Sequence, residues 1–260
     1  MLNSNVVKQS LKEGKQVFGV FCSVPVPLMV EIIAHAGFDF VIIDTEHVLI
    51  NPETLTNMIR TAEAVNIAPF VRVREASSGE ILRALDAGAK GVVVPHISSA
   101  ADAELVVKSC RYFPQGMRSL NGGRPAGFGR LDLQSYIQQA NQEIMAIAMI
   151  EDREGIEHLD EILSVPGLDM VLEGAADLSQ AYRVPWQTRS EEVKQAVGKI
   201  HQAAVKSQVT FCAIPRATED FQHWCSQGIQ AFVLGDDRGL SYRAMRDFLQ
   251  STKSKVARAE

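Results

Sequence analysis

Residues 144–152 read IMAIAMIED, and residues 168–178 read LDMVLEGAADL. Each stretch is a short, nearly continuous apolar run that ends in acidic residues. Strands buried on both faces have this pattern, whereas strands with one wet face alternate apolar and polar residues. The segment between the two runs is long enough for a helix and its turns. Residues 144–178 therefore predict a strand–helix–strand unit with parallel strands.

Six more runs of this kind lie elsewhere in the chain. They are VFGVFCSV (17–24), FDFVIIDTEH (38–47), APFVRVR (68–74), GVVVPHI (91–97), VTFCAIPR (209–216) and QAFVLGDD (230–237). Helical patterns such as EILRALDAG (80–88) and EEVKQAVGKIHQAAVKS (191–207) separate them, and several end in the glycine that commonly stops a helix. Strand and helix thus alternate eight times.

Two α/β architectures fit this alternation, an open doubly wound sheet and a closed (β/α)8 TIM barrel. The count of eight and the length of 260 residues favour the barrel. No GxGxxG follows the first strand, which weakens the dinucleotide-binding sheet. We expect a single barrel domain over residues 1–260, with a short surface helix in residues 1–16. We also expect an extra helix after the fourth strand, behind the Gly- and Pro-rich loop that begins at residue 111.

Composition excludes several classes of protein. The chain is 46% hydrophobic, has a net charge of −5, and contains neither a membrane-length apolar run nor a signal-peptide pattern. We expect a cytoplasmic protein that binds neither nucleic acid nor a membrane. The four cysteines form no CxxC pair, so a disulfide framework or zinc site is disfavoured, while a nucleophilic cysteine stays a minor alternative.

The active site of such a barrel is built at the carboxyl ends of its strands. Polar residues follow seven of the eight predicted strands: Asp44 to His47, Arg72 and Arg74, His96, Glu151 and Asp152, Glu173 and Asp177, Arg216, and Asp236 to Arg238. We expect these side chains to share one mouth. Gly174, Ala175 and Ala176 are small enough to leave that mouth open for a compact substrate, but the direction of Glu173 is not readable.

Each candidate also has a simpler interpretation. Asp177 is suitably placed to cap the next helix. Arg72 lies in an apolar strand and must pair with a protein carboxylate or an anionic substrate. His47 and His96 are equally compatible with structural roles. Glu151 and Asp177 end adjacent strands, and two carboxylates are typical protein ligands for Mg²⁺.

Several motifs together resemble the HpcH/HpaI aldolase family of the phosphoenolpyruvate/pyruvate barrel superfamily. They are IDTEH (43–47), PFVRV (69–73), RYFPQGMRS (111–119), the run from Met149 to Asp169, and GAADLS (174–179). The resemblance implies that Glu151 and Asp177 hold Mg²⁺ or Mn²⁺ and that Arg72 binds a pyruvate carboxylate. It also implies that His47 is an acid/base oriented by Asp44, and that the chain forms a homo-oligomer, a dimer or a hexamer.

Other segments depart from the aldolase pattern. VLEGAADLS (171–179), LNGGRPAGFG (120–129) and LGDDRG (234–239) are similar to the citrate synthases of siderophore gene clusters of the staphyloferrin B type. That subgroup implies condensation of oxaloacetate with acetyl-CoA and no required metal cofactor. Its second substrate carboxylate requires further cationic groups, for which His96, Arg124 and Arg216 are candidates.

Three functions follow as hypotheses. The first is a citrate synthase in which His47 or His96 polarises the keto oxygen of oxaloacetate and Glu151 or Asp177 takes the proton from acetyl-CoA. The second is a metal-dependent pyruvate aldolase that cleaves a 4-hydroxy-2-keto acid. The third is a catalytically silent barrel that binds or scaffolds another protein, which the charged strand ends disfavour.

Overall fold

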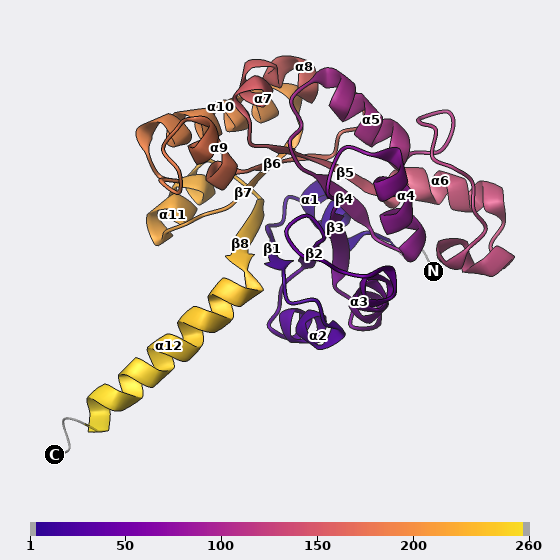
Figure 1. Cartoon of the computed structure of the whole chain (residues 1–260). Coiled ribbons are helices and arrows are strands. Elements are labelled where there is room, and N and C mark those ends of the chain that lie inside the picture. Colours follow the sequence, from indigo (N-terminus) through magenta and orange to yellow (C-terminus); the bar gives the residue numbers. More distant parts are fainter. Residues whose placement is uncertain (1–3, 257–260) are drawn as a thin grey trace.

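The computed structural model describes residues 4–256 and has a closed barrel of eight parallel strands (Figure 1). The strands are β1 (Val17–Cys22), β2 (Phe40–Asp44), β3 (Ala68–Arg72), β4 (Gly91–Val94), β5 (Met145–Ile150), β6 (Met170–Glu173), β7 (Thr210–Ala213) and β8 (Ala231–Asp236). They follow one another in chain order, and β1 pairs with both β2 and β8. The predicted (β/α)8 barrel is confirmed.

Helices connect the strands on the outside of the barrel. They are α1 (Val6–Lys12), α2 (Pro27–His35), α3 (Pro52–Ala64), α4 (Ser78–Ala87), α5 (Ala100–Cys110), the 3₁₀ helix η1 (Arg124–Gly129), α6 (Leu133–Glu143), α7 (Arg153–Glu157), α8 (Leu159–Leu163), α9 (Ala175–Ala181), α10 (Glu191–Ser207), α11 (Thr218–Ser226) and α12 (Asp237–Val256). The expected extra helix after β4 is α6. Two helices, rather than one, follow each of β5 and β6. None of the helices between residues 4 and 256 is long and apolar enough to span a membrane.

Apolar side chains fill the barrel in two layers. One buried cluster lies inside the strands and includes Phe40, Phe70 and Met145, and a larger one lies between the strands and the helices. A Cβ atom on Gly19 of β1 would lie 2.0 Å from the Phe40 ring, so only glycine leaves room for that ring. The inner layer makes the barrel a packed core rather than a pore, which leaves only the mouth for a site.

The first helix closes one end of the barrel. Asn5 caps α1, and its side chain also donates to the backbone carbonyls of Lys90 and Glu143, which precede β4 and β5. Val7 is fully buried in the inner cluster. The expectation of a plain surface helix was therefore incomplete, because one side of α1 seals the amino-terminal end of the barrel. The opposite end is left for chemistry.

Candidate active site at the barrel mouth

A cavity of about 470 Å³ opens at the carboxyl ends of the strands. Its lining comes from seven strand ends or the segments that follow them: Phe21, Ser23, Asp44, His47, Arg72, Met149, Gly174, Ala176, Asp177, Gln180, Pro185, Trp186, Ile214, Arg216, Asp236 and Arg238. Seven of the polar residues expected at the mouth are present in this set: Asp44, His47, Arg72, Asp177, Arg216, Asp236 and Arg238. Glu151 lies behind Gly174 in the cavity wall, and His96 lies beside Glu151.

The guanidinium of Arg72 is held by two carboxylates of the protein. It donates to both oxygens of Asp44 at 3.0 and 2.9 Å, and its third nitrogen lies 3.0 Å from Glu46. The Phe21 ring lies under the guanidinium, 4.6 Å from the ring centre. A buried arginine is costly unless its charge is paired, and here both its edges are occupied. Arg72 therefore reaches the cavity from a fixed position.

Asp44 orients Arg72 and not the imidazole of His47. Its carboxylate accepts from Arg72 and from the backbone N–H groups of Glu46 and His47. Within residues 4–256, the His47 ring has one ionic neighbour, Glu46, at 3.9 Å. Asp44 was expected to orient the His47 imidazole, but its carboxylate binds the Arg72 guanidinium instead. A backbone contact fixes where the loop turns but leaves the exposed His47 ring unoriented.

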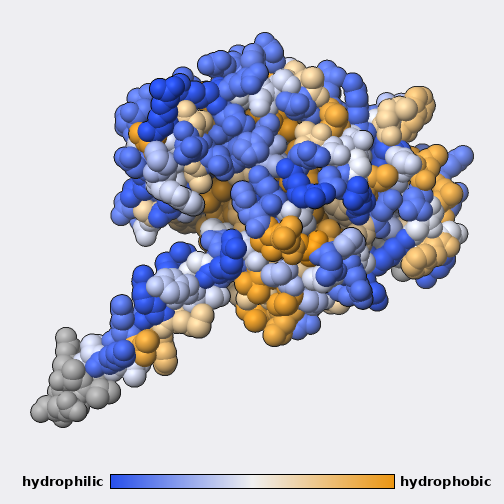
Figure 2. All heavy atoms as spheres, in the orientation of Figure 1, coloured by the Kyte–Doolittle hydropathy of each residue, from blue (hydrophilic) through white to orange (hydrophobic). Residues whose placement is uncertain are grey.

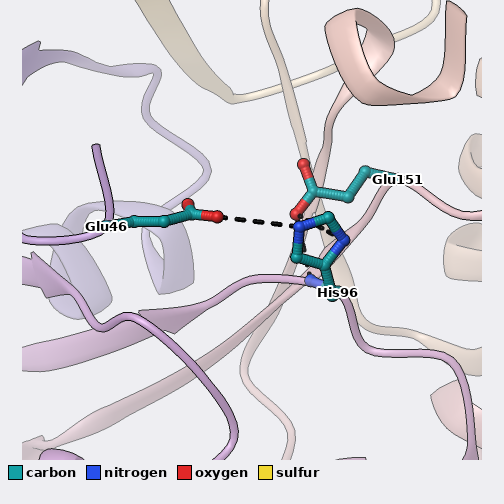
Figure 3. A group of neighbouring side chains, drawn as sticks. All are labelled: Glu46, His96 and Glu151. Carbon is teal, nitrogen blue, oxygen red and sulfur yellow. Dashed lines mark hydrogen bonds and ion pairs between the residues drawn. The ribbon is translucent and has the colours of Figure 1, made fainter. Parts of the chain in front are cut away.

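Glu46, His96 and Glu151 form a compact cluster beside the cavity. The imidazole of His96 lies between the two carboxylates, 3.7 Å from Glu46 and 3.8 Å from Glu151 (Figure 3). Asp152 contacts the ring at 3.0 Å, and the backbone N–H of His96 donates to Glu151 at 3.0 Å. Burial acts to lower the pKa of His96, but the surrounding carboxylates raise it above its ordinary value.

Glu151 has the ionisation behaviour of a catalytic group. It is 1% exposed, and burial raises its pKa to about 7, with Asp177 and Glu46 adding negative charge and His96 opposing the shift. One of its carboxylate oxygens has no hydrogen-bond partner among the described residues. A Cβ atom on Gly174 would lie 2.4 Å from that oxygen. Glycine at position 174 is thus what admits the carboxylate to the cavity wall.

Glu173 points away from the cavity centre, toward the end of β7. Its carboxylate accepts from the backbone N–H groups of Ala175 and Ile214 and from both terminal nitrogens of Arg216, at 2.6 and 3.1 Å. Glu173 is 1% exposed, whereas a quarter of the Arg216 side chain remains accessible. The pair therefore anchors a cation at the cavity edge.

Comparison with known proteins identifies the lineage of this site. A sequence profile described as HpcH/HpaI aldolase/citrate lyase matches residues 17–244, nearly the whole barrel. The chain belongs to the HpcH/HpaI family. This confirms the resemblance predicted from the motifs.

Relatives with different named activities are similar to this chain. The crystal structure of citrate synthase SbnG is 48% identical, with 96% of this chain and 98% of that one covered and a TM-score of 0.89. An HpcH/HpaI aldolase from Desulfitobacterium hafniense has the same TM-score at 28% identity, with 95% and 96% covered. The hydroxypyruvate/pyruvate aldolase of Paraburkholderia phytofirmans is 30% identical over 96% of this chain and 98% of its own.

Among residues 4–256, one group of three side chains could hold a cation. It consists of Glu46, His96 and Glu151, whose donor atoms all lie within 4.8 Å of one another. Two carboxylates, an imidazole and the unpartnered oxygen of Glu151 fit a divalent ion. The group shares Glu151 with the expected pair Glu151 and Asp177 and adds Glu46 and His96. Asp177 lines the adjoining cavity and adds negative charge near Glu151, so the expected pair stays a prediction.

Asp177 stands in the first turn of α9 without capping it. Gly174 is the N-cap residue, no side chain caps the helix, and the Asp177 carboxylate makes no hydrogen bond within the described chain. It lines the cavity with Gly174 and Ala176. Ala175, by contrast, is fully buried behind the cavity, which corrects its expected contact with substrate. The capping interpretation of Asp177 is therefore wrong, and a cavity-facing carboxylate remains.

Arg124 does not reach the barrel mouth. Its guanidinium pairs with Glu63 at the end of α3 and donates to the carbonyl of Ala87 at the end of α4. These helices start after the mouth and run toward the opposite end of the barrel, so Arg124 lies far from the other candidates within one chain. Its expected role in anion binding is corrected, since a loop residue cannot be placed from the spacing of strands.

Burial also argues against a nucleophilic cysteine. It raises the pKa of the Cys110 thiol to about 12 and raises the pKa of Cys22 and Cys212 as well. A neutral, buried thiol is a poor nucleophile. All four cysteines are free, and Cys225 is only partly buried.

Two groups at the mouth were given no role from the sequence. Glu46 was expected at the mouth with the rest of the IDTEH motif, and its position one residue before His47 was a usable signal for a role. Trp186 lines the cavity, is 84% exposed, and adopts a positive φ of 63° while its N–H donates to Ser179. No periodic pattern marks a loop residue of this kind.

Proposed function

We propose that the protein is a citrate synthase that condenses oxaloacetate with acetyl-CoA for siderophore biosynthesis. The observation that carries the proposal is the 48% identity to citrate synthase SbnG over almost all of both chains, against 28–30% for the aldolases described above. The site chemistry is consistent with it. The mouth offers cations for a dicarboxylate and two groups that hold protons near neutral pH.

The cations divide between the two ends of a small dicarboxylate. Arg72 lies on the β3 side of the cavity, and Arg216 and Arg238 lie on the side of β7 and β8. Arg216 is anchored by Glu173 and keeps its outer surface accessible. We assign one carboxylate of oxaloacetate to the Arg72 side and the second to Arg216, because a pyruvate has no group for the latter.

Glu151 and His96 provide the proton transfers in this mechanism. The Glu151 carboxylate takes a proton from the methyl group of acetyl-CoA, and the resulting enolate carbon bonds to the keto carbon of oxaloacetate. His96 donates a proton to the new alkoxide oxygen. Water then cleaves the citryl thioester, which gives citrate and free CoA. A base with a pKa near 7 is well matched to this step at neutral pH.

A thiol-release assay tests the proposal directly. Protein mixed with acetyl-CoA and oxaloacetate is expected to release free CoA thiol at the same rate with and without EDTA, and omission of oxaloacetate should abolish the release. Citrate measured in the same mixtures should match the thiol mole for mole. An absence of thiol release under all conditions would falsify the proposed reaction.

The runner-up is a metal-dependent pyruvate aldolase, favoured by the cation-compatible group of Glu46, His96 and Glu151. A bound Mg²⁺ or Mn²⁺ would there stabilise the enolate of pyruvate. Release of pyruvate from a 4-hydroxy-2-keto acid that stops with EDTA selects this function. Inactivity in both assays, together with a stable complex with another protein, would instead select the scaffolding role.

We further infer that the protein is a homo-oligomer in which α12 packs on a second copy. Figure 1 shows α12 leaving the barrel, and its main contacts in the chain are with β1 and β8. Apolar side chains on this helix are left exposed: Leu240, Tyr242, Met245, Phe248 and Leu249. Figure 2 shows a hydrophobic patch on the body near the base of α12, where Leu28 and Ile32 of α2 are 61% and 52% exposed. The apolar side of α12 and the patch on α2 could each be covered if α12 of one copy packs on α2 of another.

Light scattering coupled to size exclusion tests this inference. The parent protein is expected to elute as a dimer or larger assembly, and Phe248→Glu should shift it to smaller species because a charge replaces an interface side chain. Gln250→Glu adds the same charge on the polar side of α12 and should leave the mass unchanged. A monomeric parent protein contradicts the inference.

A further inference from the structure

A second cavity lies next to the active-site cavity, between α10 and α11. Its volume is about 390 Å³, and it is lined by Glu173, Thr188, Arg189, Lys194, Val197, Gly198, Ile214, Arg216, Glu219, Asp220, His223 and Trp224. Ile214 and Arg216 line both cavities, so one wall is common to the two. The proposed cosubstrate, acetyl-CoA, is much longer than the active-site cavity. Most of the coenzyme A must therefore bind outside that cavity.

The inner surface of this groove is apolar. Val197 and Ile214 lie along it, and Trp224 is wedged against Phe211 and His201 at ring-centre distances of 5.2 and 5.3 Å. A Cβ atom added to Gly198 would meet no atom within 4 Å, so the groove passes freely over this position of α10. Such a surface suits a slender chain of methylene and amide groups.

The rim of the groove carries cations. Arg189 lies 3.1 Å from Asp220 and 3.7 Å from Glu219, two acids that also line the groove, and it remains half exposed. Lys194, on the first half of α10, is exposed, and its ammonium has no ion pair or hydrogen bond within residues 4–256. An unpaired ammonium and an arginine beside an apolar groove provide partners for phosphate groups at the outer end of a ligand.

The shared wall connects the groove to the chemistry. Arg216 is fixed by Glu173 and by the carbonyl of Ile214, and its free surface faces both cavities. A chain running along α10 and over Ile214 reaches the active-site cavity beside Arg216. The geometry therefore leads from a cationic rim, through an apolar channel, to the reacting groups.

We propose that the groove between α10 and α11 binds the pantetheine and phosphate arm of coenzyme A, with Lys194 at its phosphate end and Gly198 beneath the pantetheine. The inference deepens the proposed function and rests on it for the identity of the ligand. The acetyl thioester then enters the mouth past Arg216, on the side opposite to Arg72. The reaction itself is unchanged by this placement.

Two variants and two controls test the groove. Gly198→Leu fills the channel in a helix that favours leucine over glycine, and Lys194→Glu reverses the rim charge. Each is expected to raise the KM for acetyl-CoA by about tenfold or more, with kcat and the KM for oxaloacetate within about twofold of the parent. Gln195→Leu and Lys199→Glu, at exposed positions of the same helix outside the groove, are expected to change the KM for acetyl-CoA less than about threefold.

Calorimetric titration with coenzyme A alone separates this inference from the proposed reaction. Weaker binding by Gly198→Leu and Lys194→Glu than by the parent supports the groove even if no citrate forms. Parent-like KM and binding in both variants overturns the groove while leaving citrate synthesis intact. A parent protein that neither binds coenzyme A nor turns over acetyl-CoA overturns both.

Discussion

Replacing Glu151 with glutamine is expected to reduce thiol release from acetyl-CoA and oxaloacetate by about 100-fold or more, the usual contribution of a positioned acid or base. Glutamine keeps the size of the side chain and the bond from the N–H of His96, so the loss isolates proton transfer. Glu157→Gln changes an exposed acid on α7 and should retain the parent rate. Retention of more than about a tenth of the parent rate by Glu151→Gln would rule out the assigned base.

The pH profile of the parent and the melting temperature of Glu151→Gln together show whether the variant loses activity through lost proton transfer or through a less stable fold. In EDTA-treated parent protein, kcat should rise with pH through about 7, because Glu151 must be ionised to accept a proton, and fall again at higher pH, where His96 has lost the proton that it donates. The folded pKa of Glu151 lies above its ordinary value of 4.5, so its contribution to stability is present below pH 4.5 and is lost as pH rises through about 7. Glu151→Gln should therefore melt at pH 8 no lower than the parent. A lower melting temperature would show that the activity loss comes from unfolding.

The barrel was predictable because its signal is repeated. Eight apolar runs separated by helical patterns predict parallel strands, and the fold then places every strand end at one mouth. That is why Arg72, Asp177 and Arg216 line one cavity and Glu151 lies in its wall. These positions follow from topology and need no knowledge of individual contacts.

Pairing among the site residues was not predictable, because it depends on side-chain reach. Asp44 was assigned to His47, three positions later in the chain, but Arg72 on the adjacent strand is the stronger partner for its carboxylate. Glu173 turned toward Arg216 across the neighbouring strand for the same reason. Arg124 failed differently, since a long loop carries no periodicity that fixes which end of the barrel it reaches.

Gly174→Ala is expected to be the most damaging single-methyl change at the site. The φ of Gly174 is −116°, outside the left-handed region that favours glycine, so we expect the effect of alanine to come mainly from lost space. The new Cβ would lie 2.4 Å from a carboxylate oxygen of Glu151 and 2.5 Å from its Cβ, and one of the two strand ends has to move. Overpacking of this kind destabilises by about 1–3 kcal/mol, and a displacement of the base near 1 Å lowers the rate by about 100-fold.

Gly79→Ala is the matched control for this change, because an added Cβ in α4 meets its nearest atoms at 3.8 Å. It should leave the rate unchanged and raise the free energy of unfolding by up to about 1 kcal/mol, since alanine is the better helix former. Thiol release and urea unfolding of both variants provide the measurement. If Gly174→Ala keeps the parent rate, Glu151 does not act through the gap that glycine leaves. Another carboxylate of the mouth must then take the proton. The candidate is Asp177, which faces the cavity and has no hydrogen-bond partner in the described chain.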